Sequence, residues 1–571
     1  MDFYSDKELI MLTRRQLTEL LLAVPFAARA ATPNPPTLCS VNGVNASPGG
    51  SLAISPSSGT LPTARVGSVY SASICVSGGT PPYTVTKTAD TTTCTWPTAS
   101  VSGSAVSIGA WPIAVESQTI TVQVRDSASN TVSGTYTIPT VSRTGYVPNI
   151  TALTPVASGT ANTNAYAALG VPSMLPGSSY TDPVTGLKVY KVTNANSAVG
   201  KTFPAATSSA SSWGWCNQYA TLGLQISQAW GASLNQYTFF VLNAGAGGGY
   251  LIDYTLGGTF SNARVSPAGE GDIHFSRLPG EAQILYYTTH TQLHRYNTAT
   301  NSLADTGSFP YTWATAGGSG ANWLQFNRKH TWATSITATS GANNFTALKI
   351  GNTPDSPIAD GTVRIVPAGG TGFNEGYSGY NNVCYLCLNS YNPGYTWNLD
   401  TNVLTSIPMG STTGTVHPGT FPGFSGSSDA NAGGGTEHLL RINDNATFTD
   451  SVIMPYYFGS FDHCGHWTQS AAAAAIWDLT CWWEEGNPSQ DSSQLSWNNT
   501  FLNVNSGALY TLCGHYSYGT NGTPGYRQQA HTTCSDDGLI VMFSSCMFVG
   551  SESSPGAEVE LFLVEMPKVA G

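Results

Sequence analysis

The chain has 571 residues, and its 21 Lys and Arg with 32 Asp and Glu make only 9% of them charged. Soluble domains ordinarily carry about 25% charged residues. Its length exceeds the ~250 to 300 residues of a single hydrophobic core, and its 41% apolar residues can fill more than one, which excludes disorder of the whole chain.

The net charge of −11 leaves no basic surface for nucleic acid, because no Lys or Arg cluster follows residue 15. We therefore expect no nucleic-acid partner. Ser, Thr, Asn and Gly replace the missing charged residues and alternate with β-branched and aromatic residues, which favours strands and turns over helices. The fold class predicted from composition is all-β.

Residues 1–31 are predicted to be a signal peptide. Arg14 and Arg15 precede an apolar run from Leu20 to Ala28, and Ala28-Arg29-Ala30 is a small-x-small cleavage site. The residues around the two arginines resemble a twin-arginine signal, and an ordinary signal with two chance arginines stays the alternative. The start is Met1 or Met11. No other segment reaches ~18 apolar residues, so we expect a secreted or periplasmic protein with no membrane span.

Eleven cysteines in an exported chain predict disulfides and at least one remaining thiol. Cys75 with Cys94 is the best candidate pair. Cys384-x-x-Cys387 lies in a segment typical of a strand, where positions i and i+3 face opposite sides. We expect no zinc there.

Residues 33–143 are Ser- and Thr-rich, with short β-like runs between turns. Gly78-Gly79-Thr80-Pro81-Pro82-Tyr83 and the alternating segment Thr119-Ile120-Thr121-Val122-Gln123-Val124 resemble the bacterial putative-Ig family. That resemblance implies an Ig-like β-sandwich, a module that usually serves as a spacer or adhesive unit. Residues 144–179, rich in Pro, Ser, Ala and Thr, are expected to be a linker.

An octapeptide recurs within residues 180–571 and predicts a repeated hairpin. Its copies are 296–303, 397–404 and 502–509, so that their starts lie 101 and 105 residues apart. Each copy reads as the end of a strand, a polar turn and the start of the next strand. Such an interval equals two units of about 50 residues, a length typical of propeller blades. We predict a seven-bladed β-propeller over 180–571, with eight blades as the first alternative and a sandwich or β-helix as the second. Its last strand, near Glu558 to Val564, should pair with a strand near its start and close the ring.

All ten histidines lie within residues 274–571, which suggests metal binding or proton transfer. For any single one, the alternative is a structural residue that caps a strand or stacks on an aromatic ring. They are His274, His290, His294, His330, His417, His438, His463, His466, His515 and His531.

Two histidine clusters precede predicted strands. One contains His463 and His466, and the other is Gln528-x-x-His531 followed by Ser535-x-Asp537-Gly538. Together with the opening segment YTDPVTGLKV from residue 180, they resemble the oligogalacturonate lyases, which are propeller enzymes with a divalent metal on the propeller axis. The resemblance implies a metal site of His466, Gln528 and His531, holding Mn or Ca. Thr533 stands where the family has a further His, so this chain offers one strong ligand fewer.

The resemblance also implies catalytic roles. The base is His417 or, as the second candidate, His438. The family's Arg has no match between Arg364 and Arg441, so Arg328 or Arg527 would bind the substrate carboxylate. Trp467 and Tyr526 lie near the histidine clusters in the sequence and could stack on sugar rings, so they are predicted, with Arg527, to bind substrate.

We therefore expect a monomeric, exported, carbohydrate-active protein that acts on an acidic polysaccharide or oligosaccharide. The leading hypothesis is a polysaccharide lyase that cleaves uronate-containing glycans by β-elimination. A non-catalytic propeller that binds glycans or proteins is the first alternative. A glycoside hydrolase is the second, with Glu270 and Asp272 as its candidate carboxylate pair.

Overall fold

We analysed a computed structural model of the chain. It describes residues 50–65, 70–90, 98–110, 117–141, 146–149, 152–155, 163–194, 197–202, 224–243, 248–267, 273–276, 281–289, 292–308, 325–326, 332–339, 342–350, 359–367, 375–378, 383–387, 394–407, 415–421, 424–429, 436–442, 448–455, 461–462, 467–469, 476–482, 498–503, 509–515, 532–535, 537–545 and 560–570. These residues are mostly β, as the composition predicts.

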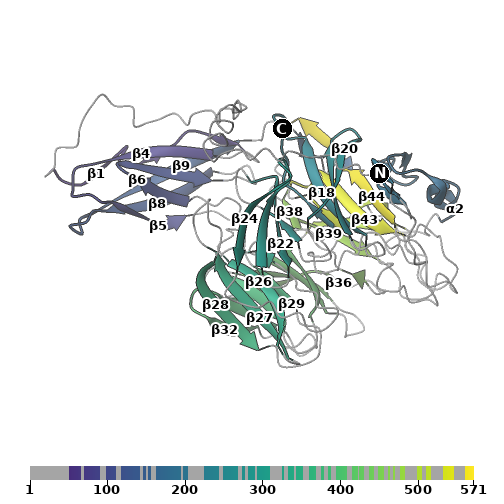
Figure 1. The fold of residues 1–571 in the computed structure, drawn as a ribbon. Helices are drawn as coiled ribbons and strands as arrows, with labels where there is room; N and C mark the ends of the chain where they lie inside the picture. The colour runs from purple at the N-terminus through teal and green to yellow at the C-terminus, as the bar shows by residue number, and fades with distance from the viewer. Residues whose placement is uncertain are drawn as a thin grey trace, which may run out of the picture.

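Two sheets that share one core form the N-terminal sheet pair, on the left of Figure 1. β8 shows why they pack together: Ile120, Val122 and Val124 are fully buried, and the residues between them face outward. One sheet has the order β1-β4-β7-β6, and the other has the order β2-β9-β8-β5, with β3 also paired to β9. The strands are β1 (Ala53–Ser55), β2 (Gly59–Thr60), β3 (Ala64–Arg65), β4 (Tyr70–Ser77), β5 (Thr84–Asp90), β6 (Thr98–Ser102), β7 (Ala105–Ala110), β8 (Ser117–Arg125) and β9 (Thr131–Val141).

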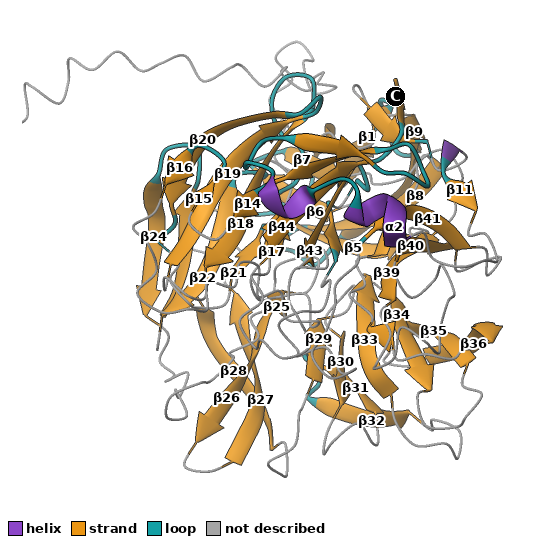
Figure 2. Ribbon diagram, turned by 90° about the vertical axis from the view of Figure 1, so that its right-hand side faces the viewer, coloured by secondary structure: helices purple, strands orange, loops and turns teal. Residues whose placement is uncertain are grey.

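Successive antiparallel sheets, which we call the ring, follow from residue 224 onward (Figure 2). Each of the first five consists of four strands in chain order. They are β17 (Leu224–Ile226), β18 (Gln236–Asn243), β19 (Gly248–Thr255) and β20 (Thr259–Val265); β21 (Ile273–Phe275), β22 (Ile284–Thr289), β23 (Gln292–Asn297) and β24 (Ser302–Ser308); β25 (Gln325–Phe326), β26 (Trp332–Thr339), β27 (Ala342–Ile350) and β28 (Ala359–Pro367); β29 (Glu375–Ser378), β30 (Val383–Cys387), β31 (Gly394–Asn398) and β32 (Val403–Ile407); β33 (Thr415–Phe421), β34 (Phe424–Asp429), β35 (Thr436–Ile442) and β36 (Phe448–Pro455).

Two further sheets complete the ring and recruit strands from residues before 224. In the first, β39 pairs with β37, β38 and β40, and the order continues through β41 to β11. The second has the order β12-β13-β44-β43-β42. Their strands are β37 (Phe461–Asp462), β38 (Trp467–Gln469), β39 (Ile476–Trp482), β40 (Asn498–Asn503), β41 (Leu509–Gly514), β11 (Thr154–Pro155), β42 (Thr533–Cys534), β43 (Ile540–Ser545), β44 (Glu560–Glu565), β13 (Lys188–Lys191) and β12 (Ser179–Thr181).

The ring is closed by the pairing that the sequence predicts. β44 pairs with β13, with Val564 opposite Val189 and Phe562 opposite Lys191. The last sheet therefore contains strands from both ends of the domain, which removes two open edges. Neighbouring sheets pack face to face: β18, β19, β43 and β44 share one apolar cluster, and β18, β19, β21 and β22 share another. This arrangement is of the β-propeller type.

The segment predicted to be a linker packs onto the ring instead of only connecting two domains. β10 (Tyr146–Pro148) pairs with β45 (Lys568–Ala570), and β11 adds a strand beside β41. Leu153, Tyr166 and Val171 enter a core cluster of the ring. This segment also contains helix α2 (Thr163–Ala167) and the 3-10 helix η2 (Val171–Ser173). After β13 come the short strands β14 (Thr193–Asn194), β15 (Ser197–Ala198) and β16 (Lys201–Thr202).

The octapeptides are hairpins, as predicted. Tyr296 lies opposite Leu303, Trp397 opposite Leu404, and Leu502 opposite Leu509. In the first two copies, Asn297 Oδ1 and Asn398 Oδ1 each accept two backbone N–H groups of the turn.

No helix in the described ranges is long and apolar enough to cross a membrane.

Candidate functional site

The innermost layer of the ring consists of the first strands of its sheets. β17 contacts β42 and β21, β29 contacts β25 and β33, and β33 contacts β38. A propeller presents these strands to its central channel, where ligands commonly bind. These first strands therefore define the region of the candidate site.

The two candidate bases lie on strands of one sheet. His417 is on the innermost strand β33, and His438 is on β35. Both strands run in the same direction, since each is antiparallel to β34. His438 lies opposite Ser427, and the register of β33 shifts between Val416 and Gly419, around His417. The backbone thus brings both histidines to the same level of the sheet, two strand spacings or about 10 Å apart.

Trp467, a predicted sugar-binding residue, begins β38 and lies opposite Asp478. β38 contacts β33, so the backbone of Trp467 belongs to the strand beside that of His417. His417, His438 and Trp467 therefore lie on two neighbouring sheets, with His417 and Trp467 on adjacent first strands.

The other predicted site residues lie outside the described residues. They are Arg328, His466, Tyr526, Arg527, Gln528 and His531. Within the described part of the chain, no group of three His, Cys, Asp or Glu side chains could hold a metal ion. The predicted metal site and the carboxylate-binding arginine therefore stay predictions.

The segment after His531 belongs to a buried interface between sheets. Thr533, at the position of the family's further His, starts β42 and lies opposite Met542. Thr532 is buried and donates from Oγ1 to Asn499 Oδ1 at 2.5 Å. Asn499 in turn donates from Nδ2 to Cys513 Sγ at 3.4 Å. This chain of bonds fixes the start of β42 against β40 and β41.

The Ser535-x-Asp537-Gly538 motif is a hairpin turn with a structural role. Asp537 Oδ1 accepts from Ser535 Oγ at 2.7 Å and from the Leu539 amide at 3.1 Å. Its Oδ2 accepts from the Tyr237 hydroxyl at 2.7 Å, which ties β42–β43 to β18 of the neighbouring sheet. Gly538 has φ 71, a left-handed conformation that favours glycine.

Three histidines have described side chains, and all three are buried in the core. His274 packs against Phe326, with ring centroids 5.3 Å apart. His294 stacks on Tyr287 at 4.7 Å, and burial lowers the pKa of its imidazole. His515 is fully buried, and its carbonyl accepts from Ser545 Oγ. For these three, the structural alternative fits better than the catalytic one.

The described cysteines include one in a disulfide and two outside any disulfide. Cys75 is disulfide-bonded, as expected, and its predicted partner Cys94 lies outside the described residues. Cys513 and Cys534 are buried and belong to no disulfide, and burial raises the pKa of Cys513 well above its ordinary value. Cys384 and Cys387 lie on strand β30, as the sequence indicates.

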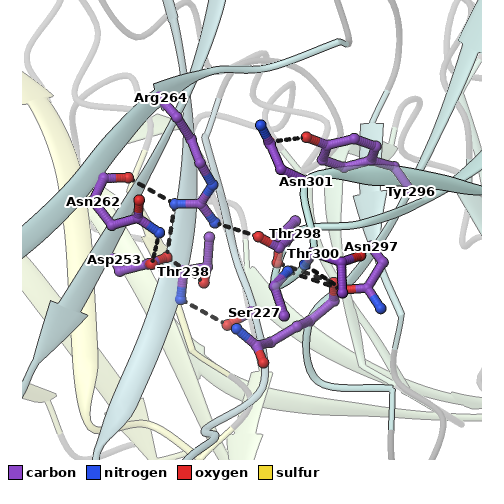
Figure 3. Close-up of polar contacts among 12 residues, drawn as sticks. Ser227, Thr238, Asp253, Asn262, Arg264, Tyr296, Asn297, Thr298, Thr300 and Asn301 are labelled. Carbon is purple, nitrogen blue, oxygen red and sulfur yellow. Dashed lines mark hydrogen bonds and ion pairs between the residues drawn. The ribbon is translucent and has the colours of Figure 1, made fainter. Parts of the chain in front are cut away.

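A polar connection between sheets, not predicted from the sequence, involves two arginines, the first of which is shown in Figure 3. Arg264 on β20 pairs with Asp253 Oδ1 at 3.1 Å and donates to the Thr298 carbonyl at 2.9 Å, inside the first octapeptide turn. Arg364 on β28 donates to the carbonyls of Leu399 and Asp400 at 3.3 Å, inside the second turn. The 100-residue separation of the two arginines, close to the octapeptide interval, is the signal that could have revealed this connection.

No protein-family model matches the chain, and no curated protein matches it. Several solved structures are similar in outline. They include an inactive variant of virginiamycin B lyase from Staphylococcus aureus (10% identity, 60% of this chain and 94% of that chain, TM-score 0.34) and an auxiliary nutrient binding protein from Bacteroides thetaiotaomicron (9%, 90% and 98%, 0.33). A third is the RRP9 WD40 repeats (10%, 60% and 99%, 0.32). TM-scores of this size identify neither a family nor a function, and our description of the fold rests on the strand pairing.

Proposed function

We propose that the chain is an exported carbohydrate-active protein, with an Ig-like sandwich over 33–143 and a seven-bladed propeller over 180–571. The order of the ring sheets supports seven blades, because each has its own first strand next to that of a neighbour. The two-sheet core of the N-terminal sheet pair supports the Ig-like assignment.

The proposed activity is the cleavage of a uronate-containing polysaccharide by β-elimination. The observation that carries it is the register of β33, β34 and β35, which sets His417 and His438 on either side of Ser427 in a sheet whose first strand adjoins that of Trp467. The backbones of the two histidines thus lie at one level of the sheet, and β-elimination needs both a base and an acid.

In that reaction one neutral imidazole removes the proton from C5 of the uronate. The electron pair forms the C4–C5 double bond as the C4–O bond breaks, and the leaving oxygen takes a proton from an acid such as a second, protonated imidazole. A cation must offset the charge of the substrate carboxylate. Arg328 or Arg527 is the protein's candidate for that role, and Trp467 with Tyr526 would orient the sugar.

His466, Gln528 and His531 would hold a divalent metal, Mn or Ca. When bound, the ion would supply Lewis-acid stabilisation of the carboxylate. Two imidazoles and an amide oxygen are neutral donors, and imidazole suits borderline ions better than Ca. We therefore expect weak binding, and Mn to be preferred over Ca.

The test is turnover by the mature full chain on polygalacturonate, alginate and a neutral glycan. We expect ultraviolet absorbance from the unsaturated product with an acidic polymer only. Changing the true base, by His417→Gln or His438→Gln, should lower the rate by roughly a hundredfold or more. The control is His294→Gln, which removes a core imidazole and should lower stability rather than the turnover of folded protein. Product from the neutral glycan alone would refute the lyase and favour a hydrolase.

A non-catalytic glycan-binding propeller is the second candidate. It is favoured by Thr533, whose strand β42 belongs to a sheet interface, at the position of the family's further His. Binding of an acidic polymer, with no product under any metal condition, would select this candidate.

The proposed location is the periplasm or the cell exterior. Mass spectrometry of the protein from its native host should find a mature N-terminus at Ala31 or Thr32. An intact residue 1 or 11 on protein recovered from the cytoplasm would contradict export.

A further inference from the structure

In the described residues, the fourth strand of each of the first five ring sheets leaves one backbone edge open. Such edges pair readily with other chains, and natural proteins protect them with charged residues, Pro, register shifts or a covering strand. The fourth strands can be compared with one another, since each holds the same position in its own ring sheet.

Every fourth strand except β32 has at least one of these protections. β20, β24, β28 and β36 each contain a charged residue and show a register shift against the third strand. β13 is covered by β12, and β41 is covered by β11. The charged residues include Arg264, Asp305, Arg364, Asp450 and Lys188.

β32 has none of them. Its sequence, Val403-Leu404-Thr405-Ser406-Ile407, lacks charge and Pro, and its pairing with β31 is uninterrupted. No strand in the described residues lies beyond it. Val403 is 53% exposed and Leu404 is 38% exposed. These neighbours face opposite sides of the sheet, so both faces of β32 meet solvent. Figures 1 and 2 place it at the lower rim of the ring.

We propose that β32 is a self-association edge, which pairs antiparallel with β32 of a second copy of this chain. A two-fold axis through Thr405 would set Val403 opposite Ile407 of the other copy and Thr405 opposite itself. A second copy fits because an uncharged strand meets itself without like-charge repulsion. An edge such as β24, with Asp305, or β28, with Arg364, would bring like charges close together.

The resulting dimer is weak. Five residues span about 17 Å of edge, and an interface of that size falls below the ~1,000 Å² typical of stable complexes. The net charge of −11 on each copy opposes association further. The expected behaviour is a concentration-dependent equilibrium that salt strengthens, which departs from the monomer expected from the sequence.

Sedimentation velocity of the mature full chain over a concentration series tests the proposal. We expect the mass to rise from one to two copies with concentration. Thr405→Lys and Thr405→Asp should each remain monomeric, and an equimolar mixture of the two should associate again. The control is Thr306→Lys on β24, the same change on another fourth strand, which should associate like the parent protein.

Oxidative crosslinking gives a second measurement. Thr405→Cys should form a covalent dimer, because its Cα atoms would lie about 5 Å apart across the axis, within the reach of a disulfide. Thr306→Cys should not. A parent protein that stays monomeric at every concentration would overturn the proposal. So would association that Thr405→Lys leaves unchanged, or charge variants that fail to recombine.

Discussion

Loss of the Lys191 ammonium should weaken ring closure more than any other single charge change on β13. Lys191 Nζ lies 2.7 Å from Glu560 Oε2 and donates to the carbonyls of Val171 and Pro172, each at 3.0 Å. Its side chain is 0% exposed, and that of Glu560 is 10% exposed. All three ammonium hydrogens therefore have acceptors, and they join η2, β13 and β44.

Lys191→Met keeps the length of the side chain and removes the charge. The Glu560 carboxylate is then buried without its counter-charge, and breaking a buried ion pair in this way costs about 3 to 5 kcal/mol. Replacing both residues, by Lys191→Met with Glu560→Leu, should cost less than Lys191→Met alone, because no unpaired charge is left. The double-mutant cycle separates the pair from the two carbonyl bonds.

Hydrogen exchange of the β13 and β44 amides is the appropriate assay, since a chain with two units need not unfold in one step. A cost of 3 to 5 kcal/mol corresponds to amide exchange faster by roughly a hundred- to several-thousand-fold. The control is Lys188→Met on the same strand, an exposed residue that lies over the Tyr190 ring at 5.9 Å. Its effect should be near the detection limit. Equal exchange in Lys191→Met and Lys188→Met would refute the reasoning.

Three further predictions concern local features. In thermal denaturation, Asn402→Ala should lower the free energy of unfolding by about 1 to 3 kcal/mol. Asn402 has φ 60, and its Oδ1 accepts a hydrogen bond from Trp397 Nε1 at 3.1 Å. Asn402→Gly, which tolerates that φ, should cost less. The pKa of Asp126 lies below its ordinary 3.8, chiefly through the Asn130 side chain, so its stabilisation is present above pH 3.8 and is lost as the pH falls through the lower folded value. Circular dichroism of the mature full chain during acid titration should show that Asp126→Asn flattens the acid transition of the N-terminal sheet pair. Cys513 should resist alkylation until urea unfolds the ring, as mass spectrometry would detect; rapid labelling of folded protein would contradict its burial.

Local turn chemistry made the hairpins predictable. Each octapeptide places a large apolar or aromatic residue and an Asn before the turn, and a residue able to adopt positive φ near its end. Asn301 and Asn402 adopt φ 56 and φ 60, and Gly507 holds the same place in the third copy. Because these preferences act over a few residues, the sequence alone was sufficient to predict the pairing.

The packing of residues 146–181 depends on distant partners and could not be predicted. The buried carboxylate of Asp182 accepts from the Gly514 amide at 3.0 Å and from the Tyr166 hydroxyl. Leu153 and Val171 are buried with them in the same cluster, although no helical or strand period marks either residue in the sequence. A segment without periodicity is predicted to be a linker. Its packing is evident only together with the surface of the ring that it contacts.

The roles of the histidines also depend on distant neighbours and could not be predicted from the sequence. Clustering in the sequence suggested chemistry for the group, with a structural role as the alternative for any single histidine. His274 and His294 fill spaces beside Phe326 and Tyr287. Composition cannot distinguish a channel imidazole from one packed between sheets, because the faces of a strand differ by a single residue. His417 and His438 are better candidates because their register relates them to each other, which is information that the sequence does not contain.

Ring closure explains why several polar bonds join the last sheet to elements from the start of the ring domain. β13 and β44 are far apart in the sequence, so joining them costs loop-closure entropy that no local contact offsets. The bonds of Lys191, the Tyr237 hydroxyl on Asp537 and the Tyr254 hydroxyl on Glu565, at 2.5 Å, all connect the last sheet to elements from before residue 260. Each is buried or half-buried, where a lost partner is costly. The two ends of the ring are thereby held by specific, directional bonds as well as by apolar packing, which selects the native register of the closing strand over a slipped one.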